Sequence, residues 1–331
     1  MASPPDISIC ILTRSQPDLL PRCVASCFAE MERSGIRGEV IVIDNASTDG
    51  SPQNVAQKFP KVRILRNEEN LGFSAANNKG IRISRGRHVL ILNDDAILRE
   101  GSLGMMLRTL DSDADIGAVG PKLLNSDGSL QRNFTNRRFP RLRSLVCGFL
   151  GLEAWLDKRT WTRDLFTHGR DLEVSGETDH IAAACLLARR EALEAVGLFD
   201  EGFDYLFEDA DLCYRLKRAG WRIIYIADAH VTHYRSASLN QLARMDKDAL
   251  IFRSLTYYFE KHSHPAQVWL LSWTLAVVVT LRLPVYCVYR LWRYGLTREE
   301  WKYSVRTSLQ AVRWLLLERP LAAGPRSVDV L

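Results

Sequence analysis

The chain has 331 residues, of which 47% are hydrophobic and 25% are charged, and its formal net charge is +5. A chain of this length can bury a large core and holds either two domains or one domain with an extension. The small positive charge favours contact with anionic surfaces, but it is too small to indicate a nucleic-acid partner, and we expect none.

The cysteines and the N-terminal residues indicate a reducing compartment. The chain has seven cysteines, none of them in a Cys-x-x-Cys pair. Their apolar surroundings predict small core residues rather than disulfides or a zinc site. The first residues lack a basic region followed by an apolar one, so we predict no secretory signal and a cytoplasmic location for the catalytic part.

Predicted strands and helices alternate over the first third of the chain. Apolar runs of strand length at 7–12, 40–43 and 62–65 each end in polar residues. Segments 19–28 and 71–80 have the apolar spacing or the small residues of helices. Repeats of this kind form a parallel sheet with crossover helices, and such sheets bind ligands where polar residues follow the strands.

Residues 87–98 are the most informative stretch. An apolar run of strand length stops at Asn93, Asp94 and Asp95 and then becomes apolar again. Ionised carboxylates are costly to bury unless a cation compensates them. At the carboxyl end of a central strand, that cation is often a metal that carries a phosphorylated ligand. We therefore predict such a site here, with an ordinary strand-ending turn as the alternative.

The middle of the chain continues the sheet. Further strands are predicted at 117–123, 179–187 and 221–226. Between the first two lies 133–178, a long region of weak periodicity, and loops of this length are usually functional or mobile. An acidic stretch that includes Glu208 and Asp209 precedes a helix that Gly220 ends.

The chain changes character after residue 238. We predict one helix at 241–262 and a nearly uncharged one at 268–289, whose uninterrupted run is shorter than the roughly 20 residues of a spanning helix. Flanking tryptophan, tyrosine and arginine residues suit a helix that lies in a membrane interface. A buried hairpin, a dimer surface and a spanning segment are the alternatives. The predicted domains are 1–238 and a helical membrane-interface extension at 239–331.

Four motifs give the chain a resemblance to a known family. They are Val-Ile-Asp-Asn-x-Ser-x-Asp-Gly at 42–50, Asn-Leu-Gly-Phe at 70–73, Leu-Asn-Asp-Asp at 92–95 and Phe-Glu-Asp-x-Asp-Leu at 207–212. In this order they resemble family 2 glycosyltransferases of the GT-A fold, in the rhamnosyltransferase-like branch. The resemblance implies an α/β fold with a mostly parallel central sheet flanked by helices.

The resemblance also implies a donor site. An acid at the position of Asp44 binds the nucleobase in relatives, and Thr13 would border the same pocket. Asp95 matches the last acid of the family's metal-binding Asp-x-Asp motif. Asn93 replaces the first acid of that motif, which leaves the role of Asp94 open. The implied cofactor is Mg²⁺ or Mn²⁺, which would bridge the donor diphosphate to Asp95 and neutralise charge on the leaving group.

Other donor-site positions follow from the same resemblance. His233, with Ser236 and Ser238, resembles a His-x-x-Gly-x-Ser segment that in relatives closes over the diphosphate and supplies a metal ligand. A structural histidine is the alternative. The remaining donor-binding residues lie in the second motif and the helix after it: Asn70, Gly72 and Asn77. The glycine would permit close backbone approach to the nucleotide, and the last asparagine would face the ligand or cap the helix.

Asp209 matches the family's catalytic base. An inverting transfer needs one carboxylate near the acceptor hydroxyl, to take its proton as the anomeric carbon is attacked from the opposite face. Glu208 would orient the acceptor or tune Asp209, because adjacent acids push their pKa values apart. The alternative is that these acids stabilise the positive end of a helix.

The predicted reaction is inverting, metal-assisted transfer of a sugar from dTDP-rhamnose or a UDP-hexose to a glycan or polyprenyl-diphosphate-linked acceptor. The interfacial helix would hold the enzyme at the cytoplasmic face of the membrane, where polysaccharide is assembled. A sugar-nucleotide nucleotidyltransferase is an alternative, although residues 13–17 lack its Gly-rich, basic triphosphate loop. A non-catalytic nucleotide-sugar-binding protein is another, and it would not require Asp209.

Overall fold

A computed structural model describes most of the chain. The described residues are 5–131, 138–143, 145, 172–204, 206–234, 244–294, 305–306, 309–310 and 312–318. For 244–249 and 282–294 the description covers the backbone alone. Most of the predicted loop at 133–178, together with Ser236 and Ser238, therefore lies outside the described residues.

Strands and helices alternate through the N-terminal half, as the sequence predicts. The first elements are β1 (Ile7–Thr13), α1 (Leu19–Arg33), β2 (Gly38–Asn45), α2 (Ser51–Lys58), β3 (Arg63–Asn67), α3 (Gly72–Ile83), β4 (His88–Asn93), β5 (Ala96–Leu98), α4 (Ser102–Asp111) and β6 (Ile116–Leu124). The later elements are β7 (Gly176–Glu177), β8 (Cys185–Arg189), α7 (Arg190–Val196), α8 (Glu208–Arg218), β9 (Arg222–His233), α9 (Arg244–His262), α10 (Pro265–Tyr294) and the short π-helix η3 (Trp314–Glu318).

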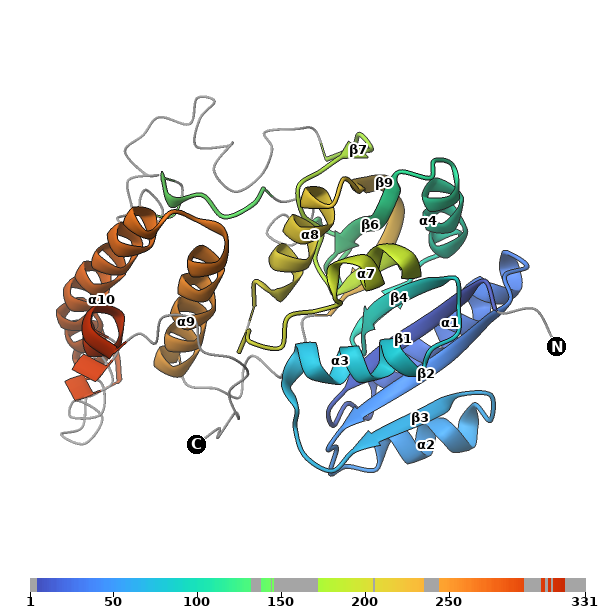
Figure 1. The fold of residues 1–331 in the computed structure, drawn as a ribbon. Coiled ribbons are helices and arrows are strands. Elements are labelled where there is room, and N and C mark those ends of the chain that lie inside the picture. The colour runs from blue at the N-terminus through green and yellow to red at the C-terminus, as the bar shows by residue number, and fades with distance from the viewer. Residues whose placement is uncertain are drawn as a thin grey trace.

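The strands form one central nine-stranded sheet, with helices on both sides (Figure 1). Its order is β3-β2-β1-β4-β8-β6-β9-β5, and β7 pairs with β9. Strands β3, β2, β1, β4, β6 and β9 run in one direction, whereas β8, β5 and β7 run against it. The predicted mostly parallel sheet flanked by helices is confirmed.

Two hydrophobic cores cover the two faces of the sheet. Successive side chains of a strand point to opposite faces, so Ile9 packs with α1 and α4 while Cys10 packs with α3 and α8. Gly80 allows α3 to lie close to β2, because a Cβ at this position would be 2.3 Å from Cδ1 of Ile43. The described cysteines are free and buried, as predicted: Cys10, Cys23, Cys27, Cys185 and Cys213.

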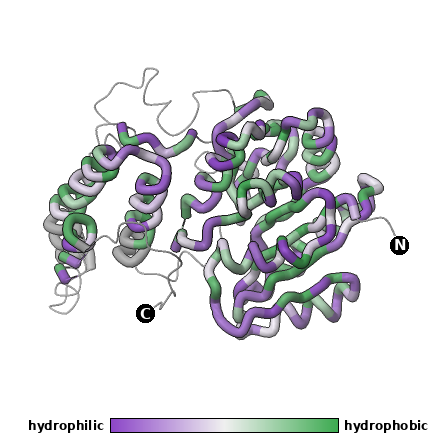
Figure 2. The backbone as a smooth tube through the Cα atoms, viewed as in Figure 1, coloured by the Kyte–Doolittle hydropathy of each residue, from purple (hydrophilic) through white to green (hydrophobic). Residues whose placement is uncertain are grey.

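Helices α9 and α10 form a hairpin with a third core. Phe259 and Leu271 pack there with Ala210 of α8, so the hairpin is docked on the helix that begins with Glu208 and Asp209. Hydrophobic residues recur along α10 and in the strands of the sheet (Figure 2). Among the described residues, no helix combines the length and apolar character required to cross a membrane.

Two strands differ from their predicted extents. The strand predicted at 179–187 begins only at Cys185, because the backbone just before it turns: the N–H of Cys185 donates to the carbonyl of Ala182 at 3.3 Å. The strand predicted at 221–226 continues to His233, since β9 pairs with β6 and then with β5 along its second half. This extension brings His233 to the edge of the sheet where β4 ends.

Candidate active site

Three parallel strands end at the same edge of the sheet. Thr13 at the end of β1 lies opposite Asp44 of β2, and Leu12 lies opposite Asn93 of β4. Polar side chains that the sequence assigns to the donor site are therefore neighbours in the fold. This is the edge at which open α/β sheets bind ligands.

The turns after β1 and β2 are tied to each other. The backbone N–H of Ser15 donates to Oγ of Ser47 at 3.0 Å, and that of Thr48 donates to Oγ of Ser15 at 3.1 Å. Ser15 and Ala46 both have left-handed backbone conformations, with φ of 57° and 62°. Strained residues of this kind persist where the surrounding structure holds them, and they cluster at ligand sites.

Asp44 is fully buried beneath these turns. Its Oδ1 accepts the backbone N–H of Ser47 at 2.8 Å. Its Oδ2 is also buried and has no hydrogen-bond partner among the described residues, and Nε of Arg66 lies 3.9 Å from it. A buried acceptor without a donor is costly, so this oxygen is suited to a ligand N–H.

The start of α3 borders the same edge. Oδ1 of Asn70 accepts from Nδ2 of Asn45 at 2.7 Å and from the N–H of Gly72 at 3.2 Å, which shapes the turn before the helix. Gly72 has φ of 77°, and a Cβ there would meet open space. Nδ2 of Asn77 donates to the carbonyl of Phe73 at 3.0 Å, whereas its buried Oδ1 has no hydrogen-bond partner in the described chain.

Asp94 is oriented toward the end of β1. Burial, and then the charge of Asp95, raise the pKa of Asp94 to about 7, although the hydroxyl of Thr13 and the backbone N–H of Arg14 oppose this rise. Two adjacent acids at one strand end therefore do not ionise equally. A bound cation would favour the charged form of both.

Asp95 and His233 come together because β5 pairs with β9. Nε2 of His233 lies 3.3 Å from Oδ1 of Asp95, and Nδ1 of the ring bonds Oε1 of Gln131 at 3.0 Å. With Nδ1 as the donor, a neutral His233 has its lone pair on Nε2. Neighbouring ligands about 2.1 Å from an octahedral cation lie about 3.0 Å apart, so the pair fits Mg²⁺ or Mn²⁺. The described residues contain no cluster of three or more such ligands.

Glu208 and Asp209 open α8 after a strained turn. Leu206 and Phe207 have left-handed conformations, with φ of 63° and 70°. Burial, and then the charge of Asp209, raise the pKa of Glu208 to about 8. The neutral form of Glu208 is therefore favoured beside the charge of Asp209.

One stretch of backbone links the two acidic clusters. The carbonyl of Ala184 accepts the N–H of Asn93 at 3.1 Å. The N–H of Ala183, the preceding residue, lies 3.4 Å from Oδ2 of Asp209. The start of α8 is thus next to the end of β4, so Asp209 lies near Asn93.

His180 is a site residue that sequence reasoning missed. Its Nε2 lies 3.2 Å from Oδ1 of Asp209 and its side chain is 3% exposed. The sequence places it at the start of an apolar segment and gives it no motif. A lone histidine in such a segment is usually a core residue, so the contact could be found only in the fold.

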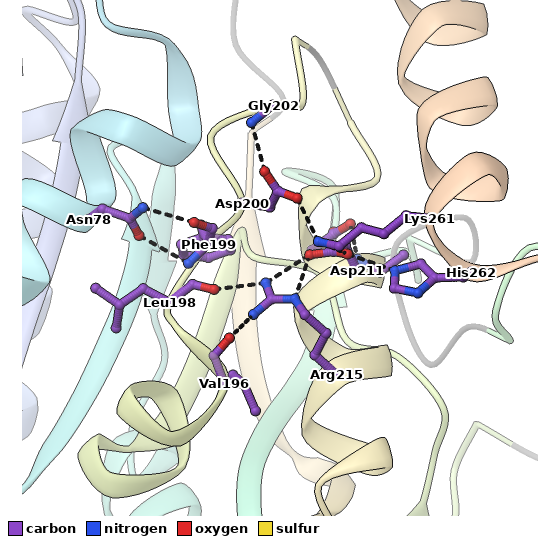
Figure 3. A network of polar contacts seen from close by, with 12 residues as sticks. Asn78, Val196, Leu198, Phe199, Asp200, Gly202, Asp211, Arg215, Lys261 and His262 are labelled. Atoms are coloured by element: carbon purple, nitrogen blue, oxygen red, sulfur yellow. Dashed lines mark hydrogen bonds and ion pairs between the residues drawn. The ribbon is translucent and has the colours of Figure 1, made fainter. Parts of the chain in front are cut away.

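Asp211 joins α8 to α9 (Figure 3). The carboxylate is fully buried, and Arg215, Lys261 and His262 each place a nitrogen 2.7 Å from it. Burial acts to raise its pKa, but the hydrogen bond of His262 and the cations of Arg215 and Lys261 outweigh it and lower the pKa to about 2. Lys261 also contacts Asp200 in the loop before α8. The hairpin is therefore bound to the helix that carries Asp209.

Comparison with known proteins identifies the family. Residues 8–197 match the family described as glycosyl transferase family 2, and residues 152–316 match glycosyl transferase family group 2. N-acetylglucosaminyl-diphospho-decaprenol L-rhamnosyltransferase of Mycobacterium tuberculosis is 31% identical over 299 residues, covering 83% of this chain and 91% of the relative. The chain belongs to glycosyltransferase family 2. The transferase is also 27% identical to succinoglycan biosynthesis protein ExoO of Rhizobium meliloti, over 75% of this chain and 66% of that protein.

Solved structures share the fold of the transferase. The mannosyltransferase PcManGT from Pyrobaculum calidifontis, in complex with GDP-Man and Mn²⁺, superimposes with a TM-score of 0.55 at 17% identity, over 96% of this chain and 89% of that one. TarS residues 1–349 of S. aureus superimpose with a TM-score of 0.51 at 15% identity, over 94% and 90%. The predicted GT-A fold and the rhamnosyltransferase-like resemblance are confirmed.

Proposed function

We propose that the transferase moves a sugar from dTDP-rhamnose or a UDP-hexose to a polyprenyl-diphosphate-linked or glycan acceptor, with inversion at the anomeric carbon. The observation that supports the proposal is the link from Asn93 through Ala184 and Ala183 to Asp209, because it joins a residue that we assign to the donor to the residue that we assign as the base. The name of the Mycobacterium tuberculosis relative specifies rhamnose and N-acetylglucosaminyl-diphospho-decaprenol, which supports this choice of donor and acceptor.

Asp44 is the residue that we assign to the nucleobase. The imide N–H of uracil or thymine would donate to Oδ2, the buried oxygen that has no hydrogen-bond partner among the described residues. Thr13 lies opposite Asp44 in the register of β1 and β2 and would border the same pocket. The start of α3 would complete it, through Asn70, Gly72 and Oδ1 of Asn77, which has no hydrogen-bond partner in the described part of the chain.

Asp95 and His233 would hold a divalent cation, Mg²⁺ or Mn²⁺, with Asn93 and Asp94 beside it. The support is their 3.3 Å separation and the orientation of the ring by Gln131. Such ions commonly take one or two protein ligands and complete their shell with phosphate oxygens and water. When bound, the cation would neutralise the charge that develops on the nucleoside diphosphate as it leaves.

Asp209 would act as the base. It would accept the proton of the acceptor hydroxyl as that oxygen attacks the anomeric carbon from the face opposite the diphosphate. Glu208 keeps its proton at neutral pH, since burial and the charge of Asp209 raise its pKa to about 8. Glu208 can therefore donate a hydrogen bond to the acceptor while Asp209 accepts one.

The C-terminal extension, 239–331, would bring the catalytic part, 1–238, to the cytoplasmic surface of the membrane. One face of α10 packs on α9, but Trp269, Trp273, Val277 and Leu281 recur at four-residue spacing and are 44% to 62% exposed. The two indole rings lie 5.8 Å apart. An exposed aromatic and apolar stripe of this kind suits a bilayer interface, where a polyprenyl-linked acceptor resides.

The membrane part is tested with vesicles of phosphatidylcholine and phosphatidylglycerol. The full chain should co-sediment with them, and the double substitution Trp269→Ser with Trp273→Ser should lower the bound fraction several-fold while leaving the fold intact by circular dichroism. Val174→Ser, which removes an apolar side chain that is 62% exposed elsewhere, is the matched control. Equal binding by the double variant and the wild type would remove the support for this interface.

The transfer itself is tested with a panel of nucleotide sugars. We expect thermal stabilisation and turnover onto a polyprenyl-diphosphate-linked N-acetylglucosamine with dTDP- or UDP-sugars in the presence of Mn²⁺, and a product of inverted anomeric configuration by NMR. Asp95→Asn should abolish the Mn²⁺-dependent stabilisation, whereas Asp115→Asn, an exposed acid at the opposite edge of the sheet, should not. Metal-independent binding, or no preference for nucleoside diphosphates, would contradict the proposal.

A further inference from the structure

His180 and Asp209 form a buried pair beside the proposed donor site. Nε2 of His180 is 3.2 Å from Oδ1 of Asp209. Within the described part of the chain, neither ring nitrogen of His180 makes a hydrogen bond, so the approach of Nε2 to Asp209 is close but is not aligned as one. A neutral imidazole has one N–H donor and one acceptor nitrogen. The ring is therefore placed to use its donor on this carboxylate.

The two oxygens of Asp209 are held unequally. Oδ1 faces His180 and accepts the N–H of Ala210 at 2.8 Å. Oδ2 is 3.4 Å from the N–H of Ala183, which is a long distance for a hydrogen bond. Of the two oxygens, Oδ1 has the shorter contacts, and Oδ2 is the one that we assign to the proton of the substrate.

We propose that His180 is a positioning residue for the base: its Nε2–H donates to Oδ1 of Asp209 and leaves Oδ2 directed at the acceptor hydroxyl. The inference rests on the proposed role of Asp209. A neutral histidine in this tautomer fixes the rotamer of the carboxylate and stabilises its charged form without touching the substrate.

The pH dependence of the reaction should report this contact. Among the described residues, Glu208 and Cys213 on the same helix interact electrostatically with Asp209, and the thiol of Cys213 stays neutral because burial raises its pKa to about 12. His180 faces Asp209 from the segment before β8. Removing a donor to a carboxylate raises its pKa, so without His180 the acid limb of the pH–rate profile should move to higher pH.

Two substitutions separate donation from packing. His180→Phe keeps a buried ring and removes both nitrogens, whereas His180→Gln keeps an N–H donor at a similar reach. With the full chain, a nucleotide sugar and a lipid-linked acceptor, the Phe variant should lose about 10- to 100-fold in kcat, the effect of one hydrogen bond to a charged group. The KM for the donor should be unchanged. The Gln variant should recover most of the lost kcat.

His88→Phe is the matched control. His88 is also buried, with Nε2 2.9 Å from Oδ1 of Asp111, but it begins β4 at the opposite edge of the sheet. Its substitution should leave kcat unchanged. Should His180→Phe fail to fold, His180→Gln is compared with the similarly shaped His180→Met, where the same difference in kcat is expected.

The outcomes separate this inference from the proposed function. A folded His180→Phe variant with wild-type kcat and pH profile, or a Gln variant no better than Phe or Met, would overturn the positioning role. If Asp209→Asn is inactive in the same experiment, such a result overturns only the role of His180 and leaves the proposed base in place. If Asp209→Asn keeps wild-type kcat, the proposed base itself is wrong.

Discussion

Replacing Asp211 by asparagine should weaken the connection between the base-bearing helix and the C-terminal hairpin. Three cationic or potentially cationic side chains, Arg215, Lys261 and His262, converge on this buried carboxylate. Asparagine has nearly the same shape but no charge, and it would leave these groups with a poorer partner. Removing one member of a buried ion pair typically costs about 3 to 5 kcal/mol.

The pKa of Asp211 gives a second measure of this cost. The contacts lower it from 3.8 to about 2, and each unit corresponds to about 1.4 kcal/mol. The carboxylate therefore contributes roughly 2 to 3 kcal/mol to the free energy of unfolding at neutral pH. Because the folded pKa is depressed, this contribution is complete above about pH 4 and is lost as the pH falls toward 2.

Urea denaturation at pH 7, repeated at lower pH, measures the effect. Asp211→Asn should lower the free energy of unfolding by about 2 to 4 kcal/mol at pH 7, and the difference from wild type should shrink as the pH falls from 4 to 2. Asp113→Asn, whose ion pair with Arg222 is 42% and 44% exposed, should cost less than about 1 kcal/mol. A difference at pH 7 no larger than that of this control, or one that does not change with pH, would refute the reasoning.

Three further predictions concern the site and its supports. Glu208→Gln mimics the protonated side chain, so kcat at pH 7 should stay close to wild type. Because the pKa of Glu208 is raised in the folded state, wild type loses stability as the pH rises from about 4 to 8. The variant should therefore become more stable relative to wild type over that range, as measured by thermal denaturation. Asp44→Asn should weaken binding of UDP or dTDP about 10- to 100-fold by calorimetry, since a charged acceptor is lost. Gly80→Ala should destabilise the fold by about 1 to 3 kcal/mol in urea, because its Cβ would meet Ile43 at 2.3 Å.

Much of the sheet could be predicted from local patterns. Apolar runs that end in polar turns mark β1, β2 and β4, and the parallel arrangement of such strands places Thr13, Asp44 and Asn93 at one edge. These features depend on residues close in sequence and on one general rule of α/β topology. Periodicity and turn chemistry carry that information directly.

Contacts between distant segments could not be predicted in the same way. Asp211 lies in the first turn of α8, where an acid is favoured by the helix dipole alone, but two of its partners, Lys261 and His262, come from α9. The contact of His180 with Asp209 depends on the path that the backbone takes before β8 begins at Cys185. Neither depends on a local pattern, because each is fixed by how two elements pack in three dimensions.

The central claim is that Asp209 takes the proton of the acceptor hydroxyl, while other residues bind the nucleotide sugar. It is tested most directly by measuring, for Asp209→Asn, both the affinity for the nucleotide sugar and the rate of transfer to a lipid-linked acceptor. The account predicts an affinity within a few-fold of wild type and a kcat lower by a factor on the order of 10² to 10⁴. A variant that transfers sugar at the wild-type rate, or that loses activity only because it no longer binds the donor, would contradict it.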